Sequence, residues 1–320
     1  MKKLLLATLV LSSFVGVMNL VAEEKKDNKQ IQVKPKQKVK NIYGDFDGYI
    51  LATGKGATVL IDKNGKIVWS FKAGNNHDVW MLDNGNVLFA DGSVKEVNPK
   101  TNKVVWRYTP KYTKGGGAFA CQRLKNGNTV VGENGTGKVT EVDPKGNVVM
   151  SFGVKPYKKG SHHNMRMVRK TADGTYLVAM TKNKIYREYD AKGNVLWEKK
   201  VDGPLAFSIV KLPNGNYLTG QVTGIVEYDK KGKVVWSYDP KKDTPEVKVG
   251  MICGINAMPN GNVAFGIYKI VQDQKNGAAL MEITRDKKVV WRYIDTKYRP
   301  GAMMSLEVLD NKKKPVSKLR

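Results

Sequence analysis

Residues 62–71 carry the segment DKNGKIVWSF, and close copies of it recur along the rest of the chain. Each copy begins with a polar turn rich in Gly, Asn or Lys and continues as a run of β-branched residues that ends near an aromatic side chain. This order predicts a strand end, a tight turn and a second strand. An interval of about 40 residues with such strand content is typical of a propeller blade. The copies lie at residues 98–108, 143–152, 190–199, 229–238 and 284–293.

A second repeated segment places an Asn-Gly or Asp-Gly pair before an apolar strand, as at Asn84-Gly85 and Asn126-Gly127. Such a pair predicts a two-residue hairpin turn in which both residues take positive φ. Two hairpin turns per interval imply four strands, which we name A to D from the axis outward. Six sets of B, C and D strands are visible, and the first begins at Gly48.

The first of these sets has no A strand before it, whereas residues 303–311 near the C-terminus resemble the A strand at residues 77–84. A strand from the C-terminus would complete the first blade and leave no open sheet edge at the seam. The sequence therefore predicts an all-β fold, a six-bladed β-propeller of four-stranded antiparallel blades, closed by the C-terminal strand completing the first blade. The propeller is expected over residues 42–311, with a basic tail at residues 312–320.

The N-terminal region has the pattern of an export signal. Two lysines precede an apolar run at residues 4–18, and Ala22 is a plausible cleavage point. We expect a signal peptide at residues 1–22 and a disordered, Lys-rich leader at residues 23–41. The protein would then be exported to the periplasm or the extracellular space, with no membrane span after cleavage.

Cysteine content and charge limit the other possibilities. Cys121 and Cys253 fall in the same part of the repeat three blades apart, so we expect two buried thiols and no disulfide. The formal charge of +26 is compatible with an anionic glycan or surface as partner. The lysines lie mostly in turns and form no compact run with aromatic residues, so nucleic acid is not an expected partner. We expect a monomer.

The longer B–C and D–A connections meet on one face, which is the predicted binding surface for a protein or a small ligand. All three histidines fall on this face. His77 opens the A strand of the second blade, His163 opens that of the fourth, and His162 is adjacent. The candidate ligand-binding residues are His77, Asp78, Asp91, Glu133, His162, His163 and Arg166.

These residues allow more than one role. A histidine can serve as base, acid, nucleophile or metal ligand. Alternatively, His77 hydrogen-bonds the backbone of a neighbouring blade and His162 is simply exposed. No metal site is expected, because adjacent His162 and His163 lack ligand spacing and no Cys–His cluster exists. The glycines at residues 115–117 precede a strand instead of a helix, so they read as slack in a loop and not as a phosphate-binding loop.

The recurrent Asp-x-x-Gly-x-(Val/Ile)-Val-Trp unit resembles the repeat of pyrroloquinoline-quinone (PQQ) type propellers over nearly all of the mature chain. That resemblance implies the quinoprotein-like propeller fold. Quinone-binding dehydrogenases of this type have eight blades, an adjacent cysteine pair and a calcium site. This chain has fewer predicted blades and no adjacent cysteines, so neither PQQ nor another cofactor is expected.

The chain is also similar to bacterial periplasmic arylsulfotransferases, which are six-bladed and carry His-Asp before an apolar strand and an Asn-Gly-Asn turn, as in His77-Asp78 and residues 84–86. That family transfers sulfate through a histidine. The resemblance implies a catalytic set in which His77 or His163 is the nucleophile and Arg166 or Arg299 stabilises the oxyanion. We therefore hypothesise a non-catalytic binding module first, an arylsulfotransferase-like enzyme second and a cell-surface polyanion binder third.

Overall fold

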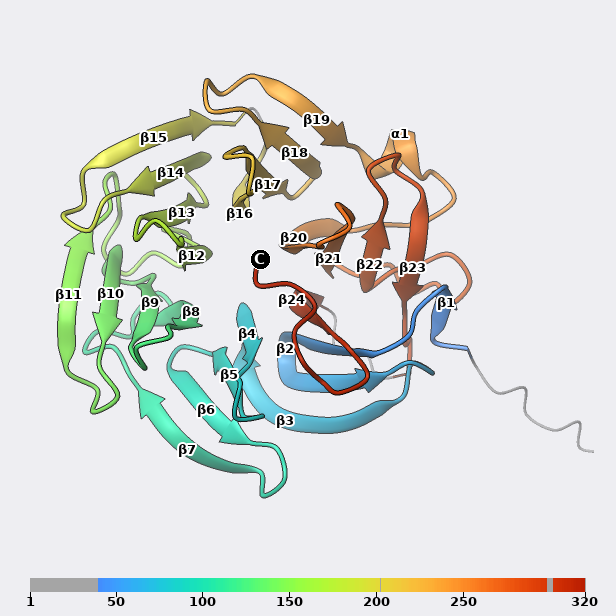
Figure 1. Ribbon diagram of the computed structural model, residues 1–320, viewed down its shortest axis with the longest axis horizontal. Helices are drawn as coiled ribbons and strands as arrows, with labels where there is room; N and C mark the ends of the chain where they lie inside the picture. The colour runs from blue at the N-terminus through green and yellow to red at the C-terminus, as the bar shows by residue number, and fades with distance from the viewer. Residues whose placement is uncertain (1–39, 202, 298–301, 320) are drawn as a thin grey trace, which may run out of the picture. The chain divides into compact units, whose positions relative to one another are not determined.

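The computed structural model describes residues 40–201, 203–297 and 302–319. The predicted signal peptide, most of the predicted leader and Arg299 lie outside the described residues. Residues 40–319 form one compact unit, in which sheets are arranged around a common centre (Figure 1). No helix in the described part of the chain has the length and hydrophobicity of a membrane span.

Four of the sheets have four antiparallel strands each, joined in chain order. The first contains β4 (Asp78–Met81), β5 (Val87–Ala90), β6 (Val94–Asn98) and β7 (Lys103–Tyr108). The second contains β8 (Ala118–Arg123), β9 (Thr129–Glu133), β10 (Lys138–Val142) and β11 (Val148–Gly153). The third contains β12 (Met167–Lys170), β13 (Tyr176–Met180), β14 (Ile185–Tyr189) and β15 (Val195–Lys200). The fourth contains β16 (Ala206–Lys211), β17 (Tyr217–Gln221), β18 (Gly224–Tyr228) and β19 (Val234–Tyr238).

The fifth sheet has eight strands in the order β1-β23-β22-β21-β24-β2-β3, with β20 also paired to β21. A short helix, α1 (Pro240–Asp243), lies between β19 and β20 in the chain. The strands are β1 (Ile42–Gly44), β2 (Tyr49–Asp62), β3 (Ile67–Asn75), β20 (Met251–Ala257), β21 (Val263–Tyr268), β22 (Leu280–Ile283), β23 (Val289–Tyr293) and β24 (Ala302–Leu309).

The long strand β2 reverses direction in its middle. The side-chain oxygens of Thr53 and Thr58 lie 2.8 Å apart, whereas five residues of extended chain would span roughly 16 Å. Gly56 lies between them with φ of +96°. Figure 1 shows the two arms of β2 side by side, so that β24, the two arms and β3 follow each other outward from the centre.

The structure confirms the predicted all-β propeller and the predicted pairing of the chain ends, because Leu309 in β24 faces Tyr49 in β2. It differs from the prediction of six separate blades. Four blades are separate, whereas the strands expected to form the other two are merged into one sheet through short pairing of β21 with β24. The two blades join where Ile267, near the end of β21, pairs with Met303, near the start of β24.

The Asn-Gly turns have a different geometry from the prediction. Gly85 has φ of +80°, whereas Asn84 uses its side-chain oxygen to accept the N–H of Asn86 at 2.9 Å. The N–H of Gly85 bonds to the carbonyl of Leu82, and the N–H of Leu82 bonds to the carbonyl of Asn86. This is the three-residue hairpin loop in which one glycine takes the left-handed conformation. The two-residue turn was therefore the wrong prediction.

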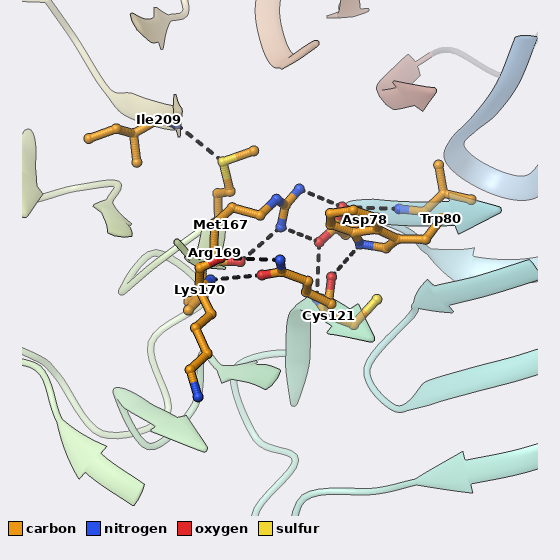
Figure 2. A network of polar contacts seen from close by, with 10 residues as sticks. Asp78, Trp80, Cys121, Met167, Arg169, Lys170 and Ile209 are labelled. Carbon is orange, nitrogen blue, oxygen red and sulfur yellow. Dashed lines mark hydrogen bonds and ion pairs between the residues drawn. The ribbon is translucent and has the colours of Figure 1, made fainter. Parts of the chain in front are cut away.

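The strands nearest the centre are β4, β8, β12, β16, β20 and β24 (Figure 1). An inner strand pairs with its blade on one side, so its other edge presents unpaired backbone groups that require partners when buried. Side chains of the preceding inner strand supply these partners. Asp78 of β4 accepts the N–H of Cys121 in β8 at 3.0 Å, and Met167 of β12 approaches the N–H of Ile209 in β16 at 3.1 Å (Figure 2).

The same kind of contact links the remaining neighbours around the axis. These contacts run from Gln122 to the N–H of Lys170 (2.7 Å), from Ser208 to the carbonyl of Cys253 (2.6 Å), from Asn256 to the N–H of Val308 (3.4 Å) and from Glu307 to the N–H of Met81 (2.6 Å). Each inner strand in the described chain is thereby bonded to the next. The hydrophobic core lies between adjacent blades, as where Val79 and Met81 pack against Leu51.

A buried glutamate stands at the same position of five C strands, a periodic signal that sequence analysis missed. These residues are Glu96, Glu141, Glu188, Glu227 and Glu282. In four of the five, an Asn of the adjacent turn donates its amide to the carboxylate, as Asn128 does to Glu141 at 2.8 Å. A cation from another sheet pairs with Glu96, Glu141, Glu188 and Glu227, as Lys170 does with Glu141 at 2.9 Å, whereas Glu282 accepts the indole N–H of Trp291 at 2.7 Å. The glutamates therefore link turns within blades and inner strands between blades.

Asp78→Ala should destabilise the ring strongly. The carboxylate of Asp78 accepts hydrogen bonds from Nη1 and Nη2 of Arg169, at 2.7 and 2.8 Å, in a pair that is almost fully buried (Figure 2). Removing one partner of a buried pair costs about 3–5 kcal/mol, because the other charge is left uncompensated. Denaturant titration measures the loss. Asp173→Ala is the matched control, since exposed Asp173 pairs with Lys211 and such pairs contribute about 1 kcal/mol or less. Equal losses in both variants would contradict the argument.

Glu141→Gln should reduce the acid sensitivity of the fold. Burial alone would raise the pKa of Glu141, but hydrogen bonds from Asn128, Lys170 and Tyr176 lower it below its ordinary value of 4.5. The unfolded chain then binds more protons than the folded one as the pH falls below 4.5, so stability is lost across that window. Denaturation midpoints between neutral pH and pH 3 should fall less steeply in Glu141→Gln than in the wild type. Glu246→Gln, at an exposed position, is the control, and identical slopes in all three proteins would refute the assignment.

Candidate functional site

The structure brings His77, His162, His163 and Arg166 together with Phe119, and we call these five residues the histidine cluster. His77 precedes β4, Phe119 belongs to β8, and the other three precede β12. The ring centroids of His77 and Phe119 are 4.2 Å apart, and His162 lies 4.9 Å from Phe119 and 6.1 Å from His77. The Arg166 guanidinium stacks over the Phe119 ring at 4.9 Å. The cluster therefore lies at the starts of three consecutive inner strands.

His77 is buried, with 6% of its surface exposed, and neither ring nitrogen has a hydrogen-bond partner among the described residues. The predicted alternative, a bond from His77 to the backbone of a neighbouring blade, is therefore wrong for the ring. A neutral imidazole carries one donor and one acceptor, and leaving both unmet in a buried place costs free energy. Such a group is a candidate for contact with a ligand.

Two asparagines fix the loops that carry the cluster. The amide of Asn134 donates to the carbonyls of Gly115 and Ser161, at 2.6 and 2.8 Å, while its oxygen accepts the N–H of Met165. Asn164 in turn donates to the carbonyl of Asn134 at 2.7 Å. Neither residue was singled out from the sequence, because an Asn in a loop gives no signal of what it will contact.

Gly116 is required by the cluster, so reading residues 115–117 as loop slack was wrong at this position. Gly116 has φ of +104°, a conformation that side-chain-bearing residues rarely adopt. A Cβ at this position would lie 2.3 Å from the Phe119 ring and 3.4 Å from Nδ1 of His162. The backbone thus passes directly against the cluster, which only a glycine permits.

Arg166 supplies an uncompensated positive charge. Its side chain is 7% exposed and donates to the carbonyl of His162 at 2.5 Å, with Nη2 lying 3.4 Å from Nδ1 of His163. Among the described residues, no carboxylate forms an ion pair with it. Burial lowers the pKa of Arg166 to about 10, against opposing effects of Cys253 and Tyr268, so it stays charged at neutral pH. A buried cation without a counterion favours an anionic ligand.

The histidines are neutral around this charge. Burial, followed by repulsion from the charge of Arg166 and from His162 when it is protonated, keeps the pKa of His77 well below 6.5. Burial and the same arginine lower the pKa of His162 to about 4 and lower that of His163. The site thus offers one fixed cation, neutral imidazoles and an aromatic ring. It suits a ligand that has both an anionic group and an apolar part.

The other predicted site residues are engaged elsewhere. Asp78 holds Arg169 and Cys121, Asp91 accepts Lys95 at 2.6 Å, and Glu133 accepts the Tyr108 hydroxyl at 2.8 Å. Arg299 lies outside the described residues. Cys121 and Cys253 are buried and neither takes part in a disulfide, as expected. No group of three or more His, Cys, Asp or Glu residues in the described part of the chain could hold a metal ion.

The fold and the recurrent turn-and-strand unit define the class of this protein, which is a β-propeller of the PQQ-type repeat superfamily. The family model described as outer membrane protein assembly factor BamB matches residues 26–173. No curated protein matches the chain.

Solved structures of the same fold are similar to this chain. A protein of unknown function from Bacteroides caccae is 22% identical, with a TM-score of 0.70 over 82% of this chain and 98% of its own. A catalytically inactive virginiamycin B lyase from Staphylococcus aureus, solved with quinupristin, is 13% identical, with a TM-score of 0.54 over 80% and 88%. The WD40 propeller domain of Doa1 is 10% identical, with a TM-score of 0.58 over 87% and 88%. At such identities the likeness concerns the fold alone.

The three histidines should titrate below the ordinary range, and their ring resonances should be assignable by NMR because the chain has only three. His162 should titrate near pH 4, and the pKa of His77 should lie well below 6.5. The unfolded chain binds more protons between pH 6.5 and about 4, so stability should fall as the pH is lowered through this window.

Arg166→Met is the informative variant for this titration. Loss of the positive charge should raise the pKa of His162, which should nevertheless stay below 6.5 because burial is the larger cause. Arg107→Met, on the exposed outer strand β7, is the control. A wild-type His77 that titrates near 6.5 would contradict the burial of its ring.

Proposed function

We propose that this protein is an exported, non-catalytic binding module that holds its ligand at the histidine cluster. The single observation that carries the proposal is His77, a buried imidazole with neither nitrogen bonded among the described residues. The signal-like N-terminal sequence supports export to the periplasm or the extracellular space. The description of the matching family model, an outer membrane assembly factor, agrees with that location.

We also infer that the ring has six blades. The doubled strand β2 supplies two strand positions, so β24, β2 and β3 correspond to one four-stranded blade and β20–β23 to another, with β1 added at its outer edge. The contacts that link each inner strand to the next support this reading. A closed ring would hold the loops that carry His77 and Arg166 at a constant separation.

The chemistry of the cluster selects the ligand class. Arg166 attracts an anion, and an imidazole N–H of neutral His77 or His162 donates to one of its oxygens. Phe119 offers an aromatic face to an attached apolar group. We therefore propose an anionic group, such as a sulfate, phosphate or carboxylate, carried on an aromatic or other apolar body.

Isothermal titration with inorganic sulfate, inorganic phosphate and 4-nitrophenyl sulfate tests this ligand class. The aryl ester should bind more tightly than the free anions, because it adds contact with Phe119. Arg166→Met should weaken binding about tenfold to a hundredfold, since a hydrogen bond to a charged group contributes about 1.5–3 kcal/mol. Arg107→Met should bind as the wild type does. Absence of binding by every one of these anions would refute the proposed ligand class.

Sulfate transfer is the second candidate, and the neutral, unpartnered nitrogen of His77 favours it because a histidine nucleophile must be unprotonated. The S–O bond to the aryl group would break, the sulfuryl group would bond to the imidazole, and a second phenol would then accept it. Release of 4-nitrophenol that is lost in His77→Ala would support this enzyme over the binding module. Heparin retention that weakens with salt and is unchanged in Arg166→Met would instead favour polyanion binding.

A further inference from the structure

A large cavity opens at the other end of the inner strands, and we call it the turn-face cavity. It has a volume of about 1390 Å³, and its lining includes Trp80, Met81 and Asn84 at the end of β4. His77 lies at the start of the same strand, so roughly 13 Å of extended chain separates this cavity from the histidine cluster. Pockets for single small molecules have volumes of about 300–1,000 Å³, so this cavity has room for a larger ligand.

Cations outnumber carboxylates in the lining of the turn-face cavity, with seven lysines and arginines against Asp83, Asp173 and Glu307. Arg169, Lys170 and Lys211 line it, and each pairs with a buried carboxylate of another blade, which fixes its position. Three further lining residues, Lys125, Lys230 and Lys318, are exposed and form no ion pair among the described residues. These lysines are the surplus charge that a ligand would meet first.

Apolar side chains also belong to the lining of the turn-face cavity. Leu82, Leu124 and Leu212 each occupy the first position of an A–B turn and are half-buried. The same hairpin turn places all three at equivalent positions of three blades. A polysulfated glycan offers no apolar groups to contact such side chains, whereas a polypeptide offers both carboxylates and aliphatic side chains.

The chain itself already places a peptide at the rim of this cavity. The carbonyl of Leu319 accepts the N–H of Ala257 at 2.7 Å and the amide of Asn256 at 3.1 Å. The hydroxyl of Ser317 donates to the carbonyl of Ala257 at 2.5 Å. Residues 315, 318 and 319 of this C-terminal segment belong to the lining. The C-terminal segment therefore satisfies these groups itself and forms one side of the rim, where it places Lys318.

We propose that the turn-face cavity is a second binding site, which takes an extended acidic segment of a partner protein with aliphatic residues between its carboxylates. The carboxylates pair with Lys125, Lys230 and Lys318, and the aliphatic side chains contact the leucines of the turns. This site is independent of the histidine cluster and requires neither His77 nor Arg166.

Fluorescence anisotropy with a labelled synthetic peptide of alternating glutamate and leucine tests the proposal on the full chain. The wild type should bind this peptide, and binding should weaken with salt. A peptide with glutamine in place of glutamate should bind at least tenfold more weakly. The triple variant Lys125→Glu, Lys230→Glu and Lys318→Glu should lose at least tenfold in affinity, because it reverses the surplus charge.

The matched control reverses three lysines of the outer turns, Lys66→Glu, Lys100→Glu and Lys145→Glu, which are exposed and lie outside the cavity lining. This control should retain the wild-type affinity, which would assign binding to the cavity and not to net charge. Equal losses in the two triple variants would overturn the proposal. Displacement of the peptide by saturating 4-nitrophenyl sulfate would also overturn it, because the two sites would then not be independent. A third contrary result is that the peptide does not bind, while heparin or anionic vesicles bind the wild type and the cavity variant equally.

Discussion

The free edges of the inner strands are the constraint on which this structure depends. A four-stranded blade leaves one edge of its inner strand exposed toward the axis, where burial makes every unpaired N–H costly. Here Asp78, Gln122, Ser208, Asn256 and Glu307 each bond a backbone group of the next inner strand, and Met167 makes the equivalent approach through sulfur. Neighbouring blades are therefore joined by directional bonds near the axis and by apolar packing farther out.

This arrangement also explains the use of charge within the ring. The buried glutamates of the C strands need cations, and several of these cations come from the ends of inner strands in another blade, as Lys170 and Lys211 do. A carboxylate that pairs with a neighbour becomes part of the seam between blades. Asp78 likewise pairs with a cation of another blade, Arg169, and it is therefore unavailable to a ligand although it is adjacent to His77.

Most buried polar groups described above have a hydrogen-bond or ion-pair partner, and the histidine cluster is the exception. Around it, Asn134 and Asn164 bond the loops tightly, yet His77 keeps two unmet ring nitrogens and Arg166 has no carboxylate among the described residues. The two asparagines hold the loops in place, whereas the unmet polar groups belong to His77 and Arg166. The loops can therefore be rigid while the site still has groups that a ligand could bond. Because these loops are already ordered, ligand binding costs less conformational entropy than it would at a flexible site.

The sequence by itself determined the strand repeat, the propeller class and the pairing of β24 with β2, because these follow from local turn chemistry and from the period of apolar residues. It also placed three histidines and Arg166 at the same end of the inner strands. Only the tertiary structure decided that Asp91 and Glu133 bond Lys95 and Tyr108, that Gly116 must be a glycine, and that β21 merges with β24. The physical reason is that strand periodicity fixes which end of a strand a residue occupies, whereas the partner of a side chain depends on how neighbouring blades twist and pack against it.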